Sequence, residues 1–86
     1  MDHVRPLNIL IIEDDEDTRA NLQDILELDD HRVESAGSAA EALARKDWSQ
    51  VSVVILDRKL PDATADELLP LIKREAPEAD FIFVTG

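Results

Sequence analysis

Residues 51–57 read Val-Ser-Val-Val-Ile-Leu-Asp, an apolar and β-branched run that stops at a carboxylate. A run that is apolar at nearly every position, rather than at every second one, is typical of a strand buried on both faces, as in a parallel sheet covered by helices. In such sheets ligands bind just beyond the carboxyl ends of the strands. Asp57 stands at that place, which makes it the first candidate for a functional side chain.

The rest of the chain alternates similar segments with amphipathic ones. Further strands are expected at residues 8–12, 32–36 and 81–84, and helices at residues 17–28, 38–46 and 64–76. The second and third helices open with a capping box, and the first carries Leu22, Ile25 and Leu26 on one stripe at helical spacing. Parallel strands joined by right-handed helical crossovers form a three-layer α/β sheet, which is the predicted fold class.

Length and composition limit what such a domain can do. The chain has 86 residues, no cysteine and a formal net charge of -11, from nine Lys and Arg against twenty Asp and Glu. One small domain is therefore expected, without disulfides or thiolate metal sites. The negative charge, in the absence of a basic stripe, argues against direct nucleic-acid binding. No signal peptide and no run of membrane-spanning length is evident, so we expect a cytoplasmic protein without membrane contact.

Acidic side chains concentrate where the first strand ends. Residues 13–17 are five acids in a row, and they lead into the first predicted helix. Acids at the start of a helix complement its dipole, which accounts for the last three of them. Glu13 and Asp14 lie directly at the strand end, where solvation alone is a weaker explanation.

Three strands end in polar groups at the same edge of the predicted sheet. Glu13 and Asp14 follow the first strand, Asp57 ends the third, and Thr85 follows the fourth. If the first and third strands are neighbours, three carboxylates converge, and such crowding costs stability unless a cation joins them. Oxygen ligands with room for water suit Mg²⁺, which commonly takes one or two carboxylates plus a phosphate. A metal-screened carboxylate beside a hydroxyl is a suitable nucleophile for phosphoryl transfer.

With these motifs the sequence resembles the receiver domains of bacterial two-component response regulators. The resemblance runs from residue 9 to residue 85, nearly the whole chain. It rests on residues 11–14 (IIED), on residues 54–57 (VILD) with Leu60 and Pro61, and on residues 83–85 (FVT).

The resemblance implies that Asp57 accepts a phosphoryl group from the phosphohistidine of a histidine kinase or a phosphotransfer protein. It also implies that Asp14, Asp57 and the backbone carbonyl of Lys59 ligate Mg²⁺, with Glu13 acting through water. The hydroxyl of Thr85 would turn toward the phosphoryl group and signal its presence. Such a module assists its own phosphorylation but is not an enzyme. The doubly wound, flavodoxin-like strand order of the family, 2-1-3-4-5, places strands one and three side by side.

The chain departs from the family after its fourth strand. The family's fourth helix, its fifth strand with a lysine at the end, and its fifth helix have no counterpart after Thr85. The lysines present are Lys46, Lys59 and Lys73, so no residue is assigned as the catalytic lysine. We therefore expect residues 1–86 to be a truncated receiver domain with strand order 2-1-3-4, open to self-association through its fourth strand.

Other classes of protein fit the motifs less well. A haloacid-dehalogenase-like phosphatase needs a second aspartate two residues after the first, where this chain has Lys59. A nucleotide-binding domain needs a glycine-rich loop, and the chain has only Gly37 and Gly86. The serious alternative is a degenerate receiver, a protein-interaction module that is never phosphorylated. The presence of all the acids and the hydroxyl together argues against it.

Overall fold

The computed structural model describes residues 6–84, which form a four-stranded sheet and three helices. In chain order the elements are β1 (Asn8–Ile12), α1 (Glu16–Leu28), β2 (Arg32–Ala36), α2 (Ala39–Leu43), β3 (Val53–Asp57), α3 (Ala65–Glu75) and β4 (Asp80–Val84). All neighbouring strands pair in parallel, and their order is β2-β1-β3-β4. The predicted doubly wound sheet, with the first and third strands side by side, is confirmed.

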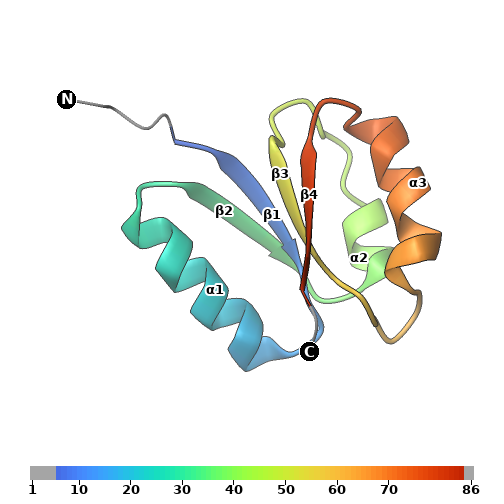
Figure 1. The fold of residues 1–86 in the computed structure, drawn as a ribbon, viewed down its shortest axis with the longest axis horizontal. Helices are drawn as coiled ribbons and strands as arrows, with labels where there is room; N and C mark the ends of the chain where they lie inside the picture. Colours follow the sequence, from blue (N-terminus) through green and yellow to red (C-terminus); the bar gives the residue numbers. More distant parts are fainter. Residues whose placement is uncertain (1–5, 85–86) are drawn as a thin grey trace.

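The helices form the outer layers of the sheet, with α1 over one face and α2 and α3 over the other (Figure 1). Side chains alternate between the two faces along each central strand, so the strands divide the core into two parts. Ile11 and Ile55 lie on the α1 side, where Leu22 and Leu26 pack against them. The larger cluster lies on the other face, and its fully buried side chains include Ile12, Val54, Leu56, Leu68 and Ile72.

The first two helices differ from their predicted form. The sequence stripe of α1 predicts burial for Ile25, but 59% of its surface is exposed. Only the narrow line through Leu22 and Leu26 reaches the sheet, and Ile25 lies to one side of that line. The second helix ends at Leu43 instead of continuing to residue 46, because the chain turns there into the connection that leads to β3. None of the helices in the described part of the chain is long and apolar enough to cross a bilayer.

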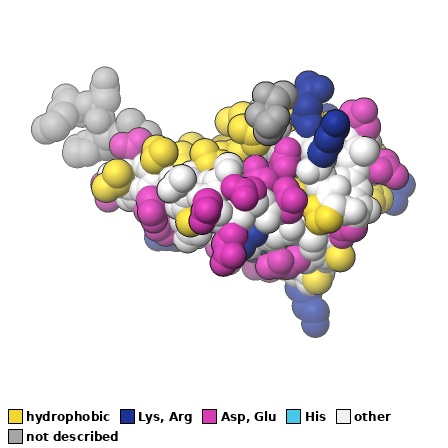
Figure 2. All heavy atoms as spheres, turned by 90° about the horizontal axis from the view of Figure 1, so that it is seen from below, with side chains coloured by type: hydrophobic (Ala, Val, Ile, Leu, Met, Phe, Trp, Pro, Cys, Tyr) yellow, Lys and Arg dark blue, Asp and Glu magenta, His cyan; other side chains and the backbone are white. Residues whose placement is uncertain are grey.

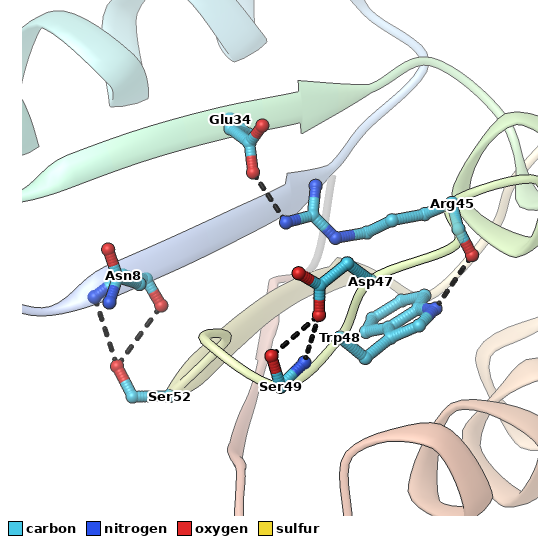
Figure 3. A network of polar contacts seen from close by, with 7 residues as sticks. All are labelled: Asn8, Glu34, Arg45, Asp47, Trp48, Ser49 and Ser52. Atoms are coloured by element: carbon cyan, nitrogen blue, oxygen red, sulfur yellow. Dashed lines mark hydrogen bonds and ion pairs between the residues drawn. The ribbon is translucent and has the colours of Figure 1, made fainter.

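A polar network fastens the connection between α2 and β3 to the sheet (Figure 3). Nη2 of Arg45 lies 2.6 Å from Oε1 of Glu34 on β2, and Nε1 of Trp48 donates a hydrogen bond to the carbonyl of Arg45 at 3.1 Å. The hydroxyl of Ser52 accepts from the backbone N–H of Asn8 at 3.0 Å and donates to the carbonyl of the same residue at 3.1 Å. The two hydrogen bonds of Ser52 hold the beginning of β1 against the beginning of β3, opposite the end that carries the acids.

The two edge strands of the sheet have different surfaces. The outer strand β2 exposes charged side chains such as Arg32 and Glu34. On β4, by contrast, Ile82 and Phe83 are 51% and 41% exposed. Within residues 6–84 no strand pairs with the outer edge of β4. An apolar strand with a free backbone edge is a template to which another strand can add.

Candidate functional site

The register of β1 on β3 brings two acidic segments of the chain together. Ile12 pairs with Leu56, so that Glu13 and Asp57 occupy the next positions at the carboxyl ends of neighbouring strands. One carboxylate oxygen from each of Glu13, Asp14 and Asp57 lies within 4.8 Å of the others. Figure 2, seen from the side where the strands end, shows Asp and Glu side chains gathered over the middle of this face. The three carboxylates predicted to converge do lie together.

The run of five acids divides into a buried part and a helix cap. Glu13 and Asp57 are 6% and 7% exposed, whereas Asp14 between them is exposed to solvent. Asp15 is the N-cap of α1, and its side chain accepts a hydrogen bond from the backbone N–H of Thr18 at 2.9 Å. The two acids that follow lie in the first helical turn, where the helix dipole favours them. Helix capping therefore explains the last three acids of the run and leaves the first two for the site.

Arg19 is a neighbour of the site that the sequence did not reveal. Its Nη1 donates a hydrogen bond to the backbone carbonyl of Glu13 at 3.0 Å, while the backbone N–H of Asp15 donates to Oε2 of Glu13 at 3.1 Å. Gly37 leaves room for this arginine, because a Cβ at that position would lie 2.8 Å from Nη1 of Arg19. An arginine one turn inside a helix is too common to be assigned from sequence, since its contact depends on how the helix lies on the sheet.

Burial raises the pKa of the Glu13 carboxyl above its ordinary value of 4.5. The hydrogen bond from the backbone of Asp15 opposes this rise, whereas the adjacent carboxyl groups of Asp57 and Asp14 add to it. The folded chain therefore holds the Glu13 proton more tightly than the unfolded chain does. Because of this group, stability falls as the pH rises from the unfolded pKa to the raised folded one, and the loss persists at higher pH.

Two basic residues follow Asp57 and border the cluster. The backbone N–H of Lys59 donates to Oδ1 of Asp57 at 3.4 Å, and the backbone N–H of Arg58 donates to the carbonyl of Val84 at 3.3 Å. Arg58 and Lys59 also line a cavity of about 270 Å³, together with Phe83 and the first residues of α3. Lys and Arg side chains lie next to the acids on the face shown in Figure 2. A chain with a net charge of -11 thus places positive charge at one side of its acidic site.

The donor set fits a hard divalent cation. Mg²⁺ takes carboxylate and carbonyl oxygens and keeps several waters, and the exposed Asp14 leaves the cluster open to water on one side. Of the other predicted site residues, the backbone of Lys59 lies beside Asp57 through its hydrogen bond. Thr85 lies outside the described residues, and its place in the site stays a prediction.

The comparisons with known proteins agree with this geometry. The sequence profile of the response regulator receiver domain matches residues 9–86. A CheY-like response regulator receiver domain protein from Methanospirillum hungatei JF-1 superposes with a TM-score of 0.86 at 34% identity, over 95% of this chain and 66% of that one. The response regulator protein TrrA from Thermotoga maritima, solved in complex with Mg²⁺-BeF, gives a TM-score of 0.81 at 25% identity, over 92% of this chain and 69% of that one.

The curated relatives are much longer than this chain. The C4-dicarboxylate transport transcriptional regulatory protein DctD of Rhizobium meliloti is 35% identical over 79 residues, which cover 92% of this chain and 17% of the relative. The matched residues cover 13% of the length of a transcriptional regulator of Haloferax volcanii and 38% of the length of the transcriptional activator DevR/DosR of Mycobacterium tuberculosis. The chain therefore spans well under half of the curated relatives that it matches.

The crowding of carboxylates predicts the effect of Asp57→Asn. The change removes one of the three charges and keeps an oxygen that can accept the hydrogen bond from Lys59. Without metal and near neutral pH, we expect the variant to be more stable than the parent by at least about 1 kcal/mol, which is the Coulomb energy of two like charges about 4 Å apart in water and increases as burial lowers the dielectric constant. This gain should shrink as the pH falls through the raised pKa of Glu13 toward 4.5, because protonation removes the same repulsion.

Urea and thermal unfolding in a chelating buffer, from acidic to neutral pH, measure this difference. Asp24→Asn, on the exposed side of α1, removes the same formal charge away from the cluster and serves as the matched control. A metal-free Asp57→Asn variant that is less stable than the parent at neutral pH would contradict the repulsion.

Proposed function

The chain belongs to the family of response regulator receiver domains, and from this we propose that it is the phosphoacceptor module of a two-component phosphorelay. Its phosphoryl donor is the phosphohistidine of a histidine kinase or of a phosphotransfer protein. The convergence of Glu13, Asp14 and Asp57 at the carboxyl ends of β1 and β3 is the observation that carries the proposal. Ligands of open α/β sheets bind at this edge.

Asp57 acts as the nucleophile in the proposed transfer. One of its carboxylate oxygens attacks phosphorus, and the O–P bond forms as the P–N bond to the imidazole breaks. The imidazole nitrogen keeps the electron pair of that bond and takes up a proton from water. The product is an acyl phosphate on Asp57, so this residue is modified by the transfer and the module is a phosphoacceptor, not an enzyme. With 7% of its surface exposed, Asp57 is largely shielded from bulk water.

Asp14, Asp57 and the backbone carbonyl of Lys59 would hold Mg²⁺, with Glu13 acting through water. When bound, Mg²⁺ offsets the repulsion among the carboxylates and stabilises charge on the transferring phosphoryl group. Burial and the neighbouring carboxyl groups raise the pKa of Glu13, and a cation held at the site would oppose that rise because it favours the ionised carboxylate. Arg58 and Lys59 favour the approach of an anionic donor to an otherwise acidic edge. The complex of TrrA with Mg²⁺-BeF supports this assignment.

The remaining parts of the proposal come from the family. The hydroxyl of Thr85 would turn toward the phosphoryl group and report its presence. Residues 1–86 would form the part of a receiver domain that runs to the end of its fourth strand, and would act in the cytoplasm. The relatives named as transcriptional regulators support a place in signal transduction. The competing proposal is a degenerate receiver that binds a protein partner without being phosphorylated.

The proposed metal site predicts a stabilising effect of Mg²⁺. A ligand that binds only the folded state adds about 2.7 kcal/mol to the free energy of unfolding when its free concentration is about 100 times its Kd. We expect thermal unfolding to show a rise in Tm with Mg²⁺ for the parent and for the control Asp24→Asn. The rise should be lost in the double variant Glu13→Gln, Asp14→Asn. An unchanged Tm of the parent at high Mg²⁺ would count against the site.

The proposed chemistry predicts Mg²⁺-dependent labelling of Asp57 by acetyl phosphate. The chain to use continues beyond residue 86 with the lysine-bearing fifth strand and flanking helices of a related receiver domain. Borohydride trapping and mass spectrometry then locate the acyl phosphate, and Asp57→Asn is the negative control. We expect the 86-residue chain to be labelled at about one hundredth of this rate or even more slowly, because the loss of one positioned cation commonly costs a factor of about 100 or more.

Two results would overturn parts of this proposal. A folded, Mg²⁺-binding extended chain that is never labelled supports the degenerate receiver. Equal labelling of the 86-residue chain and the extended chain would show that the transferred lysine is not needed.

The outer edge of β4 predicts that the 86-residue chain self-associates. Burying an apolar side chain such as Ile82 or Phe83 is worth about 1.5–3 kcal/mol, which favours pairing of two such edges. Sedimentation equilibrium should show a mass that rises with concentration, and Ile82→Lys should reduce this rise. Leu71→Lys, which changes another exposed apolar residue on α3, is the matched control. A monomer at high concentration would contradict the prediction.

A further inference from the structure

Asp62 ties the loop between β3 and α3 to the second helix. The backbone N–H groups of Ala39 and Ala40 donate hydrogen bonds to Oδ1 and Oδ2 of Asp62, each at 2.9 Å. The bonded residues are 23 and 22 positions apart in the chain, so this is a tertiary contact and not a local turn. Both carboxylate oxygens of Asp62 are thus used by the first turn of α2.

The contact completes the amino-terminal cap of a very short helix. α2 is five residues long, and its N-cap Ser38 accepts a hydrogen bond from the N–H of Glu41 at 3.1 Å. The first N–H groups of a helix have no partner inside it, and Asp62 supplies one for both Ala39 and Ala40. Ala39 is 4% exposed, so an unpaired N–H at that position would be largely hidden from water.

The base of the same loop adjoins the phosphoacceptor. Lys59 forms an isolated antiparallel bridge with Thr64, and the N–H of Leu60 donates to the carbonyl of Ala63 at 3.0 Å. The N–H of Lys59 donates in turn to Oδ1 of Asp57 at 3.4 Å. These contacts close residues 59–64 into one compact unit, with Asp62 at its tip and Lys59 at its base.

We propose that Asp62 is a positioning residue for the acidic site, because it clamps the tip of this loop to α2 and so fixes the backbone of Lys59 beside Asp57. The inference rests on the proposed function, in which the carbonyl of Lys59 is a ligand of Mg²⁺. Asp62 itself is not one of the proposed ligands of Mg²⁺, because both of its carboxylate oxygens bond the backbone of α2. It acts by limiting the positions that the base of the closed loop can take.

The charge of Asp62 suits this clamp. The hydrogen bonds from Ala40 and Ala39 lower the pKa of its carboxyl below the ordinary value of 3.8, which keeps it ionised. A negative group at a helix N-terminus is also favoured by the helix dipole. Asparagine offers one acceptor oxygen where aspartate offers two, and alanine offers none. Aspartate, asparagine and alanine at this position therefore give a series of decreasing hydrogen bonding to α2.

The test compares Mg²⁺ affinity with stability in the same chains. We expect Asp62→Ala to raise the Kd for Mg²⁺, measured by NMR titration of the folded chain, about 10-fold, the lower end of the loss seen when residues that orient metal ligands are removed. Asp62→Asn should give a smaller rise. Ser38→Ala weakens the cap of the same helix without touching the loop, so it should lower stability and leave the Kd unchanged. Asp66→Asn, an exposed neighbour, controls for charge.

Hydrogen exchange gives a second readout. Because coupling between two sites is reciprocal, Mg²⁺ should slow exchange of the Ala39 and Ala40 amides in the parent but not in Asp62→Ala. Equal Mg²⁺ affinity of the parent and a folded Asp62→Ala chain would overturn the positioning role alone. If Asp62→Ala does not fold, Asp62→Asn decides by the same comparison. Failure of the parent itself to bind Mg²⁺ would overturn the proposed metal site together with this inference.

Discussion

Repulsion between two largely buried carboxylates is the constraint around which this small domain is arranged. Glu13 and Asp57 lie at the ends of adjacent strands, and beneath them Ile12 and Leu56 are fully buried. An apolar platform of this kind gives the charges little stabilisation. Compensation comes instead from the backbone, through the N–H groups of residues 15 and 59, and from the exposed position of the third acid. The site is therefore held in place by main-chain contacts while its charges remain available to a ligand.

The two ends of the sheet balance charge in different ways. Away from the acidic edge, the charges of Arg45 and Glu34 are paired, and at the end where β1 and β3 begin the hydroxyl of Ser52 bonds the backbone of Asn8. At the end where the strands finish, acids accumulate and the basic residues stand beside them. Like charges gathered at one edge reduce the stability of the free protein, so they do not serve the fold. Such a local conflict in an otherwise consistent fold is typical of a functional site. The distribution of charge along the strands thus separates the part that supports the fold from the part that binds.

Much of this arrangement could be predicted from local sequence, and the exceptions share a physical cause. Runs that are apolar on both faces identify buried parallel strands, and the residues that end them identify the acids of the site. The helix dipole accounts for residues 15–17 from sequence alone, whereas the N-cap position of Asp15 came from the structure. The exposure of Ile25, the contact of Arg19 and the clamp at Asp62 could not be predicted, because each depends on how one element lies against another. Sequence patterns indicate which face of a segment is buried, but they do not indicate the angle at which two neighbouring elements pack.

The long-range pairing of β1 with β3 has a consequence for folding kinetics. The two strands come from distant parts of the chain, as shown by the contact between Asn8 and Ser52, which are 44 residues apart. Pairings between such distant segments are slow, because the entropy of closing the loop is lost before the contact forms. Glu13 and Asp57 therefore stay well separated in a chain that has formed only β1, α1 and β2, and their repulsion appears only when β3 docks. The acids of the site act on a step that is already slow for topological reasons, so the charge state of this edge influences the rate at which the sheet assembles.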